Sequence, residues 1–277
     1  MALLGLFDSG VGGLSVAREL MRQAPAQPML YFADQANAPY GQRSLAEIRR
    51  LAEGISRFLL EEGAQVIVVA CNTASAAALH WLRERFSEAP FVGMEPAIKP
   101  AAERSRTRHV GVIATEATFQ GELFASLMDR FATGIRVHTQ SCPVLVPLVE
   151  AGELDSERAR AALRSYLTPL LEAGIDELVL GCTHYPFLSP LIEQTVGREV
   201  EIVDPAPAVA RQAIRVAAEL GEQAQGMAAT ATYRFYTSGS PERFQRAVRE
   251  LIGLDVEVAQ AVWSSSGSLR SVSELPR

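Results

Sequence analysis

The sequence predicts an α/β protein made of two similar three-layer αβα domains, whose largely parallel sheets face a shared cleft. Short apolar runs alternate with longer amphipathic segments along most of the 277 residues, as expected when buried parallel strands alternate with helices. Residues 66–73 and 177–184 repeat one pattern, an apolar run that ends in a cysteine followed by hydrogen-bonding side chains. The order of expected elements also starts again after Glu95 and Pro96, which is typical of an internal repeat.

The first expected unit covers residues 1–96. Its longest helix places Leu45, Ile48 and Leu51 on one face and ends at Gly63, a residue that commonly follows the last turn of a helix. The expected elements are strands 3–7, 29–32, 66–70 and 91–94, and helices 13–22, 45–62 and 75–86.

The second expected unit covers residues 97–205. Its longest helix is closed by Gly174, and residues 141–150 are expected to form a connection interrupted by prolines. The expected elements are strands 109–114, 135–139, 177–181 and 201–203, and helices 116–129, 157–173 and 189–196.

The remaining residues, 206–277, contain an expected helix at 207–220, one clear strand at 232–237 and a helix at 241–252. A segment of about 70 residues with a single strand cannot easily form its own core. We therefore expect it to pack onto the first unit, so that 1–96 with 206–277 forms one discontinuous domain and 97–205 the other. The last dozen residues are rich in serine and are expected to be a loose tail.

Composition and charge exclude several classes of function. The formal net charge of −6 and the lack of a basic segment argue against binding nucleic acid. No apolar run approaches the roughly 18–20 residues of a membrane helix, and the N-terminus lacks the features of a signal peptide. The three cysteines are an odd number without a C-x-x-C pair, so free thiols and a cytoplasmic location are expected.

A glycine-rich turn follows the first strand. It begins at Gly10 and approximates the dinucleotide-binding pattern, and Asp34 ends the next strand where an acid that binds ribose would lie. However, Ser15 takes the third glycine position, and Asp8 and Ser9 crowd the turn. We therefore expect Asp8 to accept a proton or bind an ammonium group, while Ser9 and the glycine amides bind an anion.

Cys71 and Cys182 end the two repeated apolar runs, where ligands bind in open α/β sheets. A helix start is expected after each, and helix N-termini and cationic neighbours lower the pKa of a thiol. Two thiols on opposite sides of a cleft would suit proton transfer at carbon by two bases without a cofactor. Cys142, in an apolar stretch, is expected to be structural. The polar residues that follow Cys71 and Cys182 are Asn72, Thr73, Thr183 and His184.

Two other readings of the cysteines remain open. Cys182 with His184 as its base would suit a thiol hydrolase or amidotransferase, although neighbours in sequence rarely have triad geometry and Cys71 would have no role. A zinc site of Cys71, Cys182 and His184 would need these side chains within about 4 Å of one another, too close for cysteines on opposite sides of a substrate. Asp8, Glu150 and His184 are candidate auxiliary acid–base groups.

Together, in this order, the motifs resemble those of the cofactor-independent glutamate racemases over nearly the whole chain. The departures are small, such as Ser15 where threonine is common and Arg43 where lysine is common. The matching segments are 7–16, 39–41 with Ser44, 69–75, 95–100, 114–115 with Thr118, 142–143 with 147–150, and 181–186.

The resemblance implies an enzyme that interconverts L- and D-glutamate with Cys71 and Cys182 as the acid–base residues. It also implies that no metal or pyridoxal phosphate is used, and that a cytoplasmic homodimer supplies D-glutamate for peptidoglycan, and hence for cell-wall biogenesis and cell shape. Aspartate racemases share the two-cysteine plan and remain an alternative. The substrate-binding residues implied are Asp8, Ser9, Pro39, Tyr40, Gly41, Asn72, Thr73, Thr118, Thr183 and His184.

Overall fold

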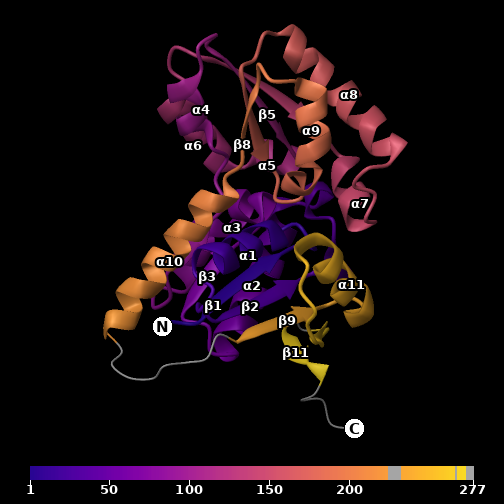
Figure 1. Ribbon diagram of the computed structural model, residues 1–277. Coiled ribbons are helices and arrows are strands. Elements are labelled where there is room, and N and C mark those ends of the chain that lie inside the picture. Colours follow the sequence, from indigo (N-terminus) through magenta and orange to yellow (C-terminus); the bar gives the residue numbers. More distant parts are fainter. Residues whose placement is uncertain (224–231, 266, 273–277) are drawn as a thin grey trace.

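The computed structural model describes residues 1–223, 232–265 and 267–272 of the chain. It contains two parallel-stranded sheets covered by helices, one above the other in Figure 1. We call the seven-stranded sheet with the helices at residues 14–23, 45–61, 72–85, 206–223 and 241–252 the large half, and the four-stranded sheet with the helices between residues 98 and 196 the small half. The fold class predicted from the sequence is confirmed.

The sheet of the large half has the strand order β11-β10-β9-β2-β1-β3-β4. Neighbouring strands are parallel except for β10 and β11, and Leu4 in β1 lies opposite both Met29 and Val66. The strands are β1 (Leu4–Asp8), β2 (Met29–Ala33), β3 (Val66–Val69), β4 (Phe91–Gly93), β9 (Tyr233–Thr237), β10 (Val258–Trp263) and β11 (Leu269–Ser271).

The sheet of the small half has the order β6-β5-β7-β8 and is parallel throughout. This is the order β2-β1-β3-β4 of the large half, element for element, so the repeat seen in the sequence is also a repeat of topology. The strands are β5 (His109–Ala114), β6 (Arg136–Ser141), β7 (Glu177–Gly181) and β8 (Glu201–Val203).

Most helices begin where the sequence pattern places them. Ser44 and Glu47 form a capping box at the start of α2, and Gly63 follows its end with a φ of +93°, which favours glycine. The helices are α1 (Leu14–Gln23), α2 (Leu45–Glu61), α3 (Asn72–Arg85), α4 (Ile98–Arg104), α5 (Glu116–Gln120), α6 (Glu122–Phe131), α7 (Leu145–Glu150), α8 (Glu157–Glu172), α9 (Ser189–Val196), α10 (Ala206–Gln223) and α11 (Pro241–Ile252), with 3₁₀ turns η1 (Gln35–Asn37), η2 (Tyr40–Gln42) and η3 (Tyr185–Leu188).

Several expected elements differ in the structure. The single helix expected over 116–129 is two helices separated at Gly121, where a Cβ would lie 2.6 Å from the Cβ of Ala76 in α3. The chain therefore turns where the two halves touch. The short helix α4 was not predicted, and the expected connection 141–150 contains α7.

The expectation of a loose tail was wrong for the part of the tail that the structure describes. β11, which lies in this tail, pairs with β10, and β10 pairs with β9. Residues 258–263 and 269–271 therefore extend the large sheet beyond the one strand that was expected in residues 206–277. Residues 266 and 273–277 of the expected tail, and 224–231 between the expected helix 207–220 and the expected strand 232–237, lie outside the described residues.

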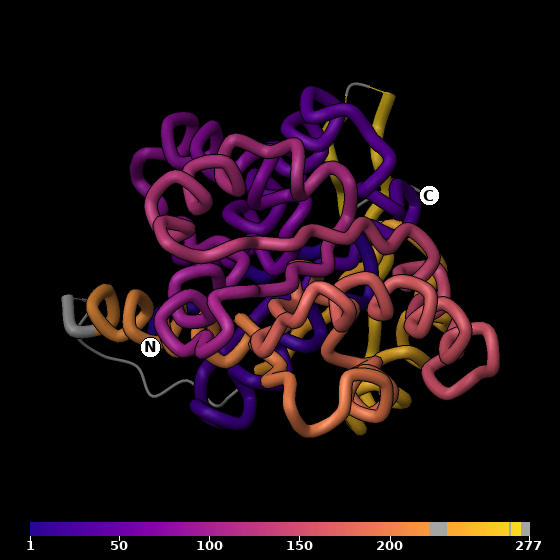
Figure 2. The backbone as a smooth tube through the Cα atoms, turned by 90° about the horizontal axis from the view of Figure 1, so that it is seen from above, coloured from indigo at the N-terminus to yellow at the C-terminus, as the bar shows by residue number. Residues whose placement is uncertain are grey.

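The hydrophobic core continues from one half into the other. One cluster of buried side chains joins Val11 and Leu14 of the large half to Leu145, Val149 and Tyr185 of the small half. Helix α10 packs against α1, and its far end lies beside the N-terminus in both views (Figures 1 and 2). No helix among residues 1–223, 232–265 and 267–272 is both long and apolar enough to cross a membrane.

Asp176 ties the loop before β5 to the start of β7. Its carboxylate accepts hydrogen bonds from the Ser105 hydroxyl at 2.6 Å and from the backbone N–H groups of Arg106 and Thr107 at 2.6 and 3.0 Å. Burial alone would raise the pKa of this carboxyl, but these hydrogen bonds outweigh burial and lower the pKa to about 2.

Replacing Asp176 by alanine is expected to lower the free energy of unfolding by about 1–3 kcal/mol at pH 7, because two backbone donors lose their acceptor. Since the folded pKa lies below the unfolded value, the stabilisation is present above about pH 4 and is lost as the pH falls towards 2. Urea unfolding across this range measures it. The control Asp129→Ala, at an exposed position on α6, is expected to cost less than about 0.5 kcal/mol; equal losses would contradict this role.

Candidate active site

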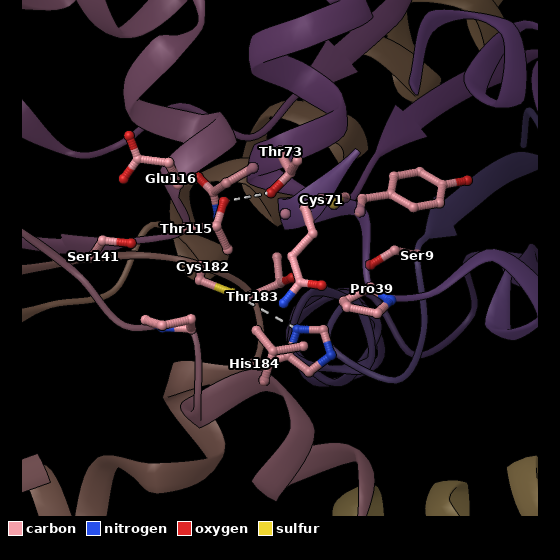
Figure 3. A pocket seen from close by; sticks show the side chains of 16 residues that line it. Ser9, Pro39, Cys71, Thr73, Thr115, Glu116, Ser141, Cys182, Thr183 and His184 are labelled. Atoms are coloured by element: carbon pink, nitrogen blue, oxygen red, sulfur yellow. Dashed lines mark hydrogen bonds between the residues drawn. The ribbon is translucent and has the colours of Figure 1, made fainter. Parts of the chain in front are cut away.

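A cavity of about 600 Å³, counted with the space open to solvent, lies between the two halves. The ends of β1, β3, β5, β6 and β7 lead to it, as expected for a ligand site in parallel α/β sheets. Figure 3 shows its lining side chains as sticks around the common space and labels ten of them. The lining residues are Ser9, Pro39, Tyr40, Gly41, Gln42, Cys71, Asn72, Thr73, Thr115, Glu116, Ser141, Pro143, Val146, Cys182, Thr183 and His184.

Cys71 follows β3 and caps the N-terminus of α3. Its Sγ accepts a hydrogen bond from the N–H of Ala74 at 3.5 Å, and the residue is 5% exposed. Burial, and then the charge of Asp8, raise the pKa of this thiol well above its ordinary value despite the N–H donors of the helix. The sequence-based expectation of a lowered thiol pKa is therefore wrong for Cys71, which is held as the thiol.

Cys182, His184 and Glu150 form a chain of polar contacts in the small half. The Sγ of Cys182 lies 3.7 Å from Nδ1 of His184 (Figure 3), and Nε2 of His184 lies 2.7 Å from Oε1 of Glu150. The expectation that neighbours in sequence lack triad geometry is wrong here. The 3₁₀ turn η3, which begins directly after His184, turns the imidazole back towards the cysteine.

The charges of His184 and Glu150 stabilise one another. Burial would lower the pKa of His184, but the hydrogen bonds to Cys182 and Glu150 outweigh it and raise the pKa well above the ordinary value. Burial would raise the pKa of Glu150, but His184 and the N–H of Val11 lower it. The pair is therefore held as imidazolium and carboxylate.

Asp8 lies beneath the cavity and joins the two halves. Its carboxylate accepts hydrogen bonds from the N–H of Gly10 at 2.8 Å and from the hydroxyl of Thr183, in the small half, at 3.1 Å. The residue is fully buried, and burial raises the pKa of its carboxyl above the ordinary value. It does not line the cavity but lies close to Cys71.

The glycine-rich turn holds groups of the small half. The N–H of Val11 donates to Oε1 of Glu150 at 2.8 Å. A Cβ on Gly10 would clash with the carboxylate of Glu150, and one on Gly12 with the ring of His184. The turn thus binds a carboxylate of the chain itself through the N–H of Val11.

Three threonine hydroxyls meet where α3 and α5 approach. Thr73 lies 2.8 Å from Thr115 and 3.3 Å from Thr118, and the last two are 2.9 Å apart, oxygen to oxygen. Thr73 and Thr115 line the cavity, whereas Thr118, a sequence-predicted binding residue, is fully buried behind them. A ligand would therefore meet Thr118 only through the other two hydroxyls.

Asn72 is the one described residue with a buried amide whose oxygen and nitrogen both lack a hydrogen-bond partner. It lines the cavity at the first turn of α3 and is 2% exposed. Burying an amide without partners is costly, and native proteins rarely do so without a reason. A polar ligand in the cavity would supply the missing partners.

The structure brings most of the predicted residues to one cavity. Cys71, Cys182 and eight of the ten predicted binding residues line it. Asp8, Glu150 and Thr118 lie behind the wall. Six further lining residues were not predicted from the sequence: Gln42, Thr115, Glu116, Ser141, Pro143 and Val146. Thr115 and Ser141 stand at the ends of β5 and β6, so the strand-end rule alone would have pointed to them.

The charges that line the cavity have two chemical consequences. Among its lining residues there is no lysine or arginine, so N–H and hydroxyl groups and the His184 imidazolium are its donors. No group of three or more His, Cys, Asp or Glu among the described residues is arranged to hold a metal ion. The arrangement suits binding of a small polar molecule beside two thiols.

A family profile and a curated relative both match this chain over most of its length. The family profile "Asp/Glu/Hydantoin racemase" matches residues 8–213, which is more than half of the chain. A curated glutamate racemase of Pseudomonas aeruginosa PAO1 is 49% identical over 94% of this chain and 98% of its own length.

Two solved structures are similar over nearly their whole length. One is the glutamate racemase of Escherichia coli in complex with L-glutamate and the activator UDP-MurNAc-ala, with 32% identity, a TM-score of 0.81, and coverage of 94% of this chain and 97% of that chain. The other is that of Francisella tularensis in complex with D-glutamate, with 28% identity, a TM-score of 0.82, and coverage of 95% and 97%.

Replacing Glu150 by glutamine is expected to lower the pKa of His184, because the imidazolium loses its carboxylate partner while burial still penalises its charge. Titration of the imidazole nitrogens by NMR measures the change. The matched control is Glu84→Gln beside the exposed His80, 3.2 Å away, which should leave the titration of His184 unchanged. A His184 titration unaltered by Glu150→Gln would contradict the assigned ion pair.

Proposed function

The chain belongs to the Asp/Glu/hydantoin racemase family and is an amino-acid racemase, and we propose that it interconverts L- and D-glutamate with Cys71 and Cys182 as its two acid–base groups. The observation that carries the proposal is that the cysteines of both repeated units line one cavity. The relatives named above as glutamate racemases, two of them solved with glutamate, support the choice of substrate.

In this proposal, neutral donors hold the substrate. The amide of Asn72 gains the partners that it lacks without ligand, and the hydroxyls of Ser9, Thr73 and Thr183 lie in the same wall. The N-terminal end of α3, an α-helix of 14 residues, adds backbone N–H groups and the positive end of the helix dipole. These groups stabilise negative charge as it develops during removal of the Cα proton.

The proton transfer uses one thiolate and one thiol. The thiolate of one cysteine takes the Cα proton and becomes a thiol, and the thiol of the other returns a proton to the opposite face and becomes a thiolate. Each turnover therefore leaves the pair in the protonation state that the reverse direction needs. Cys71 is held as the thiol by burial and Asp8, and Cys182 faces the His184 imidazolium, which favours starting with Cys182 as the base.

Asp8, Glu150 and His184 act as auxiliary groups in this proposal. The His184 imidazolium stabilises a thiolate at Cys182, and Glu150 in turn keeps His184 protonated. Asp8 is buried beside Cys71, and its carboxylate accepts the proton of that thiol when Cys71 serves as the base.

The wider setting is also a proposal. We propose that 1–96 with 206–277 and 97–205 act as two domains that close over glutamate, that the chain works as a cytoplasmic homodimer without cofactor, and that its D-glutamate enters peptidoglycan. Sedimentation of the purified chain tests the dimer, and retention of activity after exhaustive chelation tests the independence from metal.

A thiol hydrolase is the second candidate, because Cys182, His184 and Glu150 are aligned as a nucleophile, a base and its orienting carboxylate. In that mechanism Cys182 would be essential, Cys71 would be dispensable, and a covalent acyl-enzyme would form. Incubation with L-glutamate in D₂O without added cofactor separates the two mechanisms, because only racemisation places deuterium at Cα and yields D-glutamate.

Replacing either Cys71 or Cys182 by alanine is expected to reduce racemisation by at least about 100-fold, since each turnover needs both an acid and a base. The matched control is Cys142→Ala: that cysteine is fully buried but does not line the cavity. It should retain activity at a stability cost of about 1–2 kcal/mol. Circular dichroism detection of D-glutamate measures the rates, and near-normal racemisation by Cys71→Ala would rule out the two-base mechanism.

Replacing Asn72 by alanine is expected to raise KM for glutamate roughly 10- to 100-fold, because hydrogen bonds to a charged ligand contribute about 1.5–3 kcal/mol. The melting temperature of the free protein should not fall, since the amide has no partner there. Steady-state kinetics and thermal unfolding are measured on the same sample. An unchanged KM with a lowered melting temperature would mean that Asn72 is structural.

A further inference from the structure

Asp34 is a buried carboxylate that the proposed mechanism does not use. It follows β2, is fully buried, and its N–H donates to the carbonyl of Asp8 at the end of β1 at 3.0 Å. Its carboxylate receives hydrogen bonds from four neutral side chains: Tyr40 at 2.6 Å, Ser238 at 2.7 Å, Trp263 at 2.8 Å and Asn37 at 3.1 Å.

These four donors come from two distant parts of the chain. Asn37 and Tyr40 belong to the segment 35–42, which contains the two 3₁₀ turns and supplies Pro39, Tyr40, Gly41 and Gln42 to the cavity wall. Ser238 and Trp263 belong to the C-terminal part of the large sheet, more than 200 residues away in sequence. Asp34 therefore connects the C-terminal strands to the cavity wall.

The wall segment is held mainly through such contacts because it forms no strand or α-helix. The hydroxyl of Ser238 also accepts from the N–H of Ala36 at 3.0 Å, and Arg43 closes the segment by donating to the carbonyl of Asn37 at 2.7 Å. At its other end Gly41 touches the small half, where a Cβ would lie 3.0 Å from that of Thr115. A shift of the segment would therefore change the width of the cavity.

The indole of Trp263 packs closely against helix α2. Helix α2 has a glycine at position 54, where a Cβ would lie 2.6 Å from Cζ3 of Trp263. Glycine within a helix costs about 1 kcal/mol relative to alanine. Helix α2 therefore has glycine, a poor helix former, at the position where the indole of Trp263 passes the helix to reach Asp34.

We infer that Trp263 is a positioning residue for the proposed racemase: its indole N–H, with the hydroxyl of Ser238, fixes Asp34, and Asp34 fixes Tyr40 and the wall segment against the substrate. The inference rests on the proposed function for its readout. It gives the C-terminal strands a role in substrate binding although none of their residues lines the cavity.

Trp263→Phe removes the N–H and keeps an aromatic ring. It is expected to raise KM for glutamate by about fivefold or more while kcat changes less than twofold, since the cysteines are untouched. Ser238→Ala removes the second donor with little loss of packing and should raise KM in the same direction. The matched control is Trp81→Phe, which breaks another indole–carboxylate hydrogen bond, to Glu53 at 3.4 Å, and should leave KM unchanged.

A double-mutant cycle separates positioning from simple destabilisation. If Trp263 acts through Asp34 and Tyr40, the effect of Trp263→Phe on KM should largely disappear in a Tyr40→Phe background, because contacts in one network are not additive. Additive effects, or an unchanged KM in both Trp263→Phe and Ser238→Ala, would overturn the inference. A wild-type chain that does not racemise glutamate would instead overturn the proposed function, and this inference with it.

Fluorescence gives a second readout, because Trp81 and Trp263 are the two tryptophans of the chain. In the Trp81→Phe protein, the emission of Trp263 should change on titration with D-glutamate, with a midpoint that agrees with the kinetic binding constant. Emission that stays constant while glutamate is turned over would contradict a connection between the indole and the wall.

Discussion

One carboxylate oxygen of Glu150 accepts hydrogen bonds from both halves of the molecule, from the N–H of Val11 and from the ring of His184. The glycine-rich turn can approach this closely only because Gly10 and Gly12 carry no side chain. The same carboxylate fixes the imidazole beside Cys182 in the cavity wall. This half-buried anion therefore contributes both to the contact between the two halves and to the electrostatics of one thiol.

In the proposed function the substrate is bound without lysine or arginine, by neutral donors and by the His184 imidazolium that faces Cys182. A fixed cation would stabilise the carboxylate of the bound substrate as much as the transition state, and such uniform binding does not speed the chemical step. In the proposed mechanism, hydroxyl, amide and helix N–H groups bind the ground state more weakly and are oriented towards the position where charge develops. The unpartnered amide of Asn72 would act in the same way, because its polar atoms are already oriented in the cavity wall without a ligand.

The fold class and most of the cavity wall could be predicted because apolar runs locate buried strands and parallel strands end at the same edge. The raised pKa of Cys71 could not, since it depends on burial beside Asp8, which lies on another strand. The contact between Val11 and Glu150 spans 139 residues, and no local pattern encodes it. Strands β10 and β11 were missed for a similar reason: each is defined by a neighbour in the sheet and not by a strong pattern of its own.

The two cysteines have different surroundings although they end equivalent strands: Cys71 lies near a carboxyl group with a raised pKa, and Cys182 lies near an imidazolium. Two mirror-image substrates have the same free energy in water, so the equilibrium constant between them is one. For a racemase, kcat/KM must then be equal in both directions, however unequal the two faces of the site are. The asymmetry of this site can appear only as compensating differences in kcat and KM, with the enantiomer that is bound more tightly also turned over more slowly.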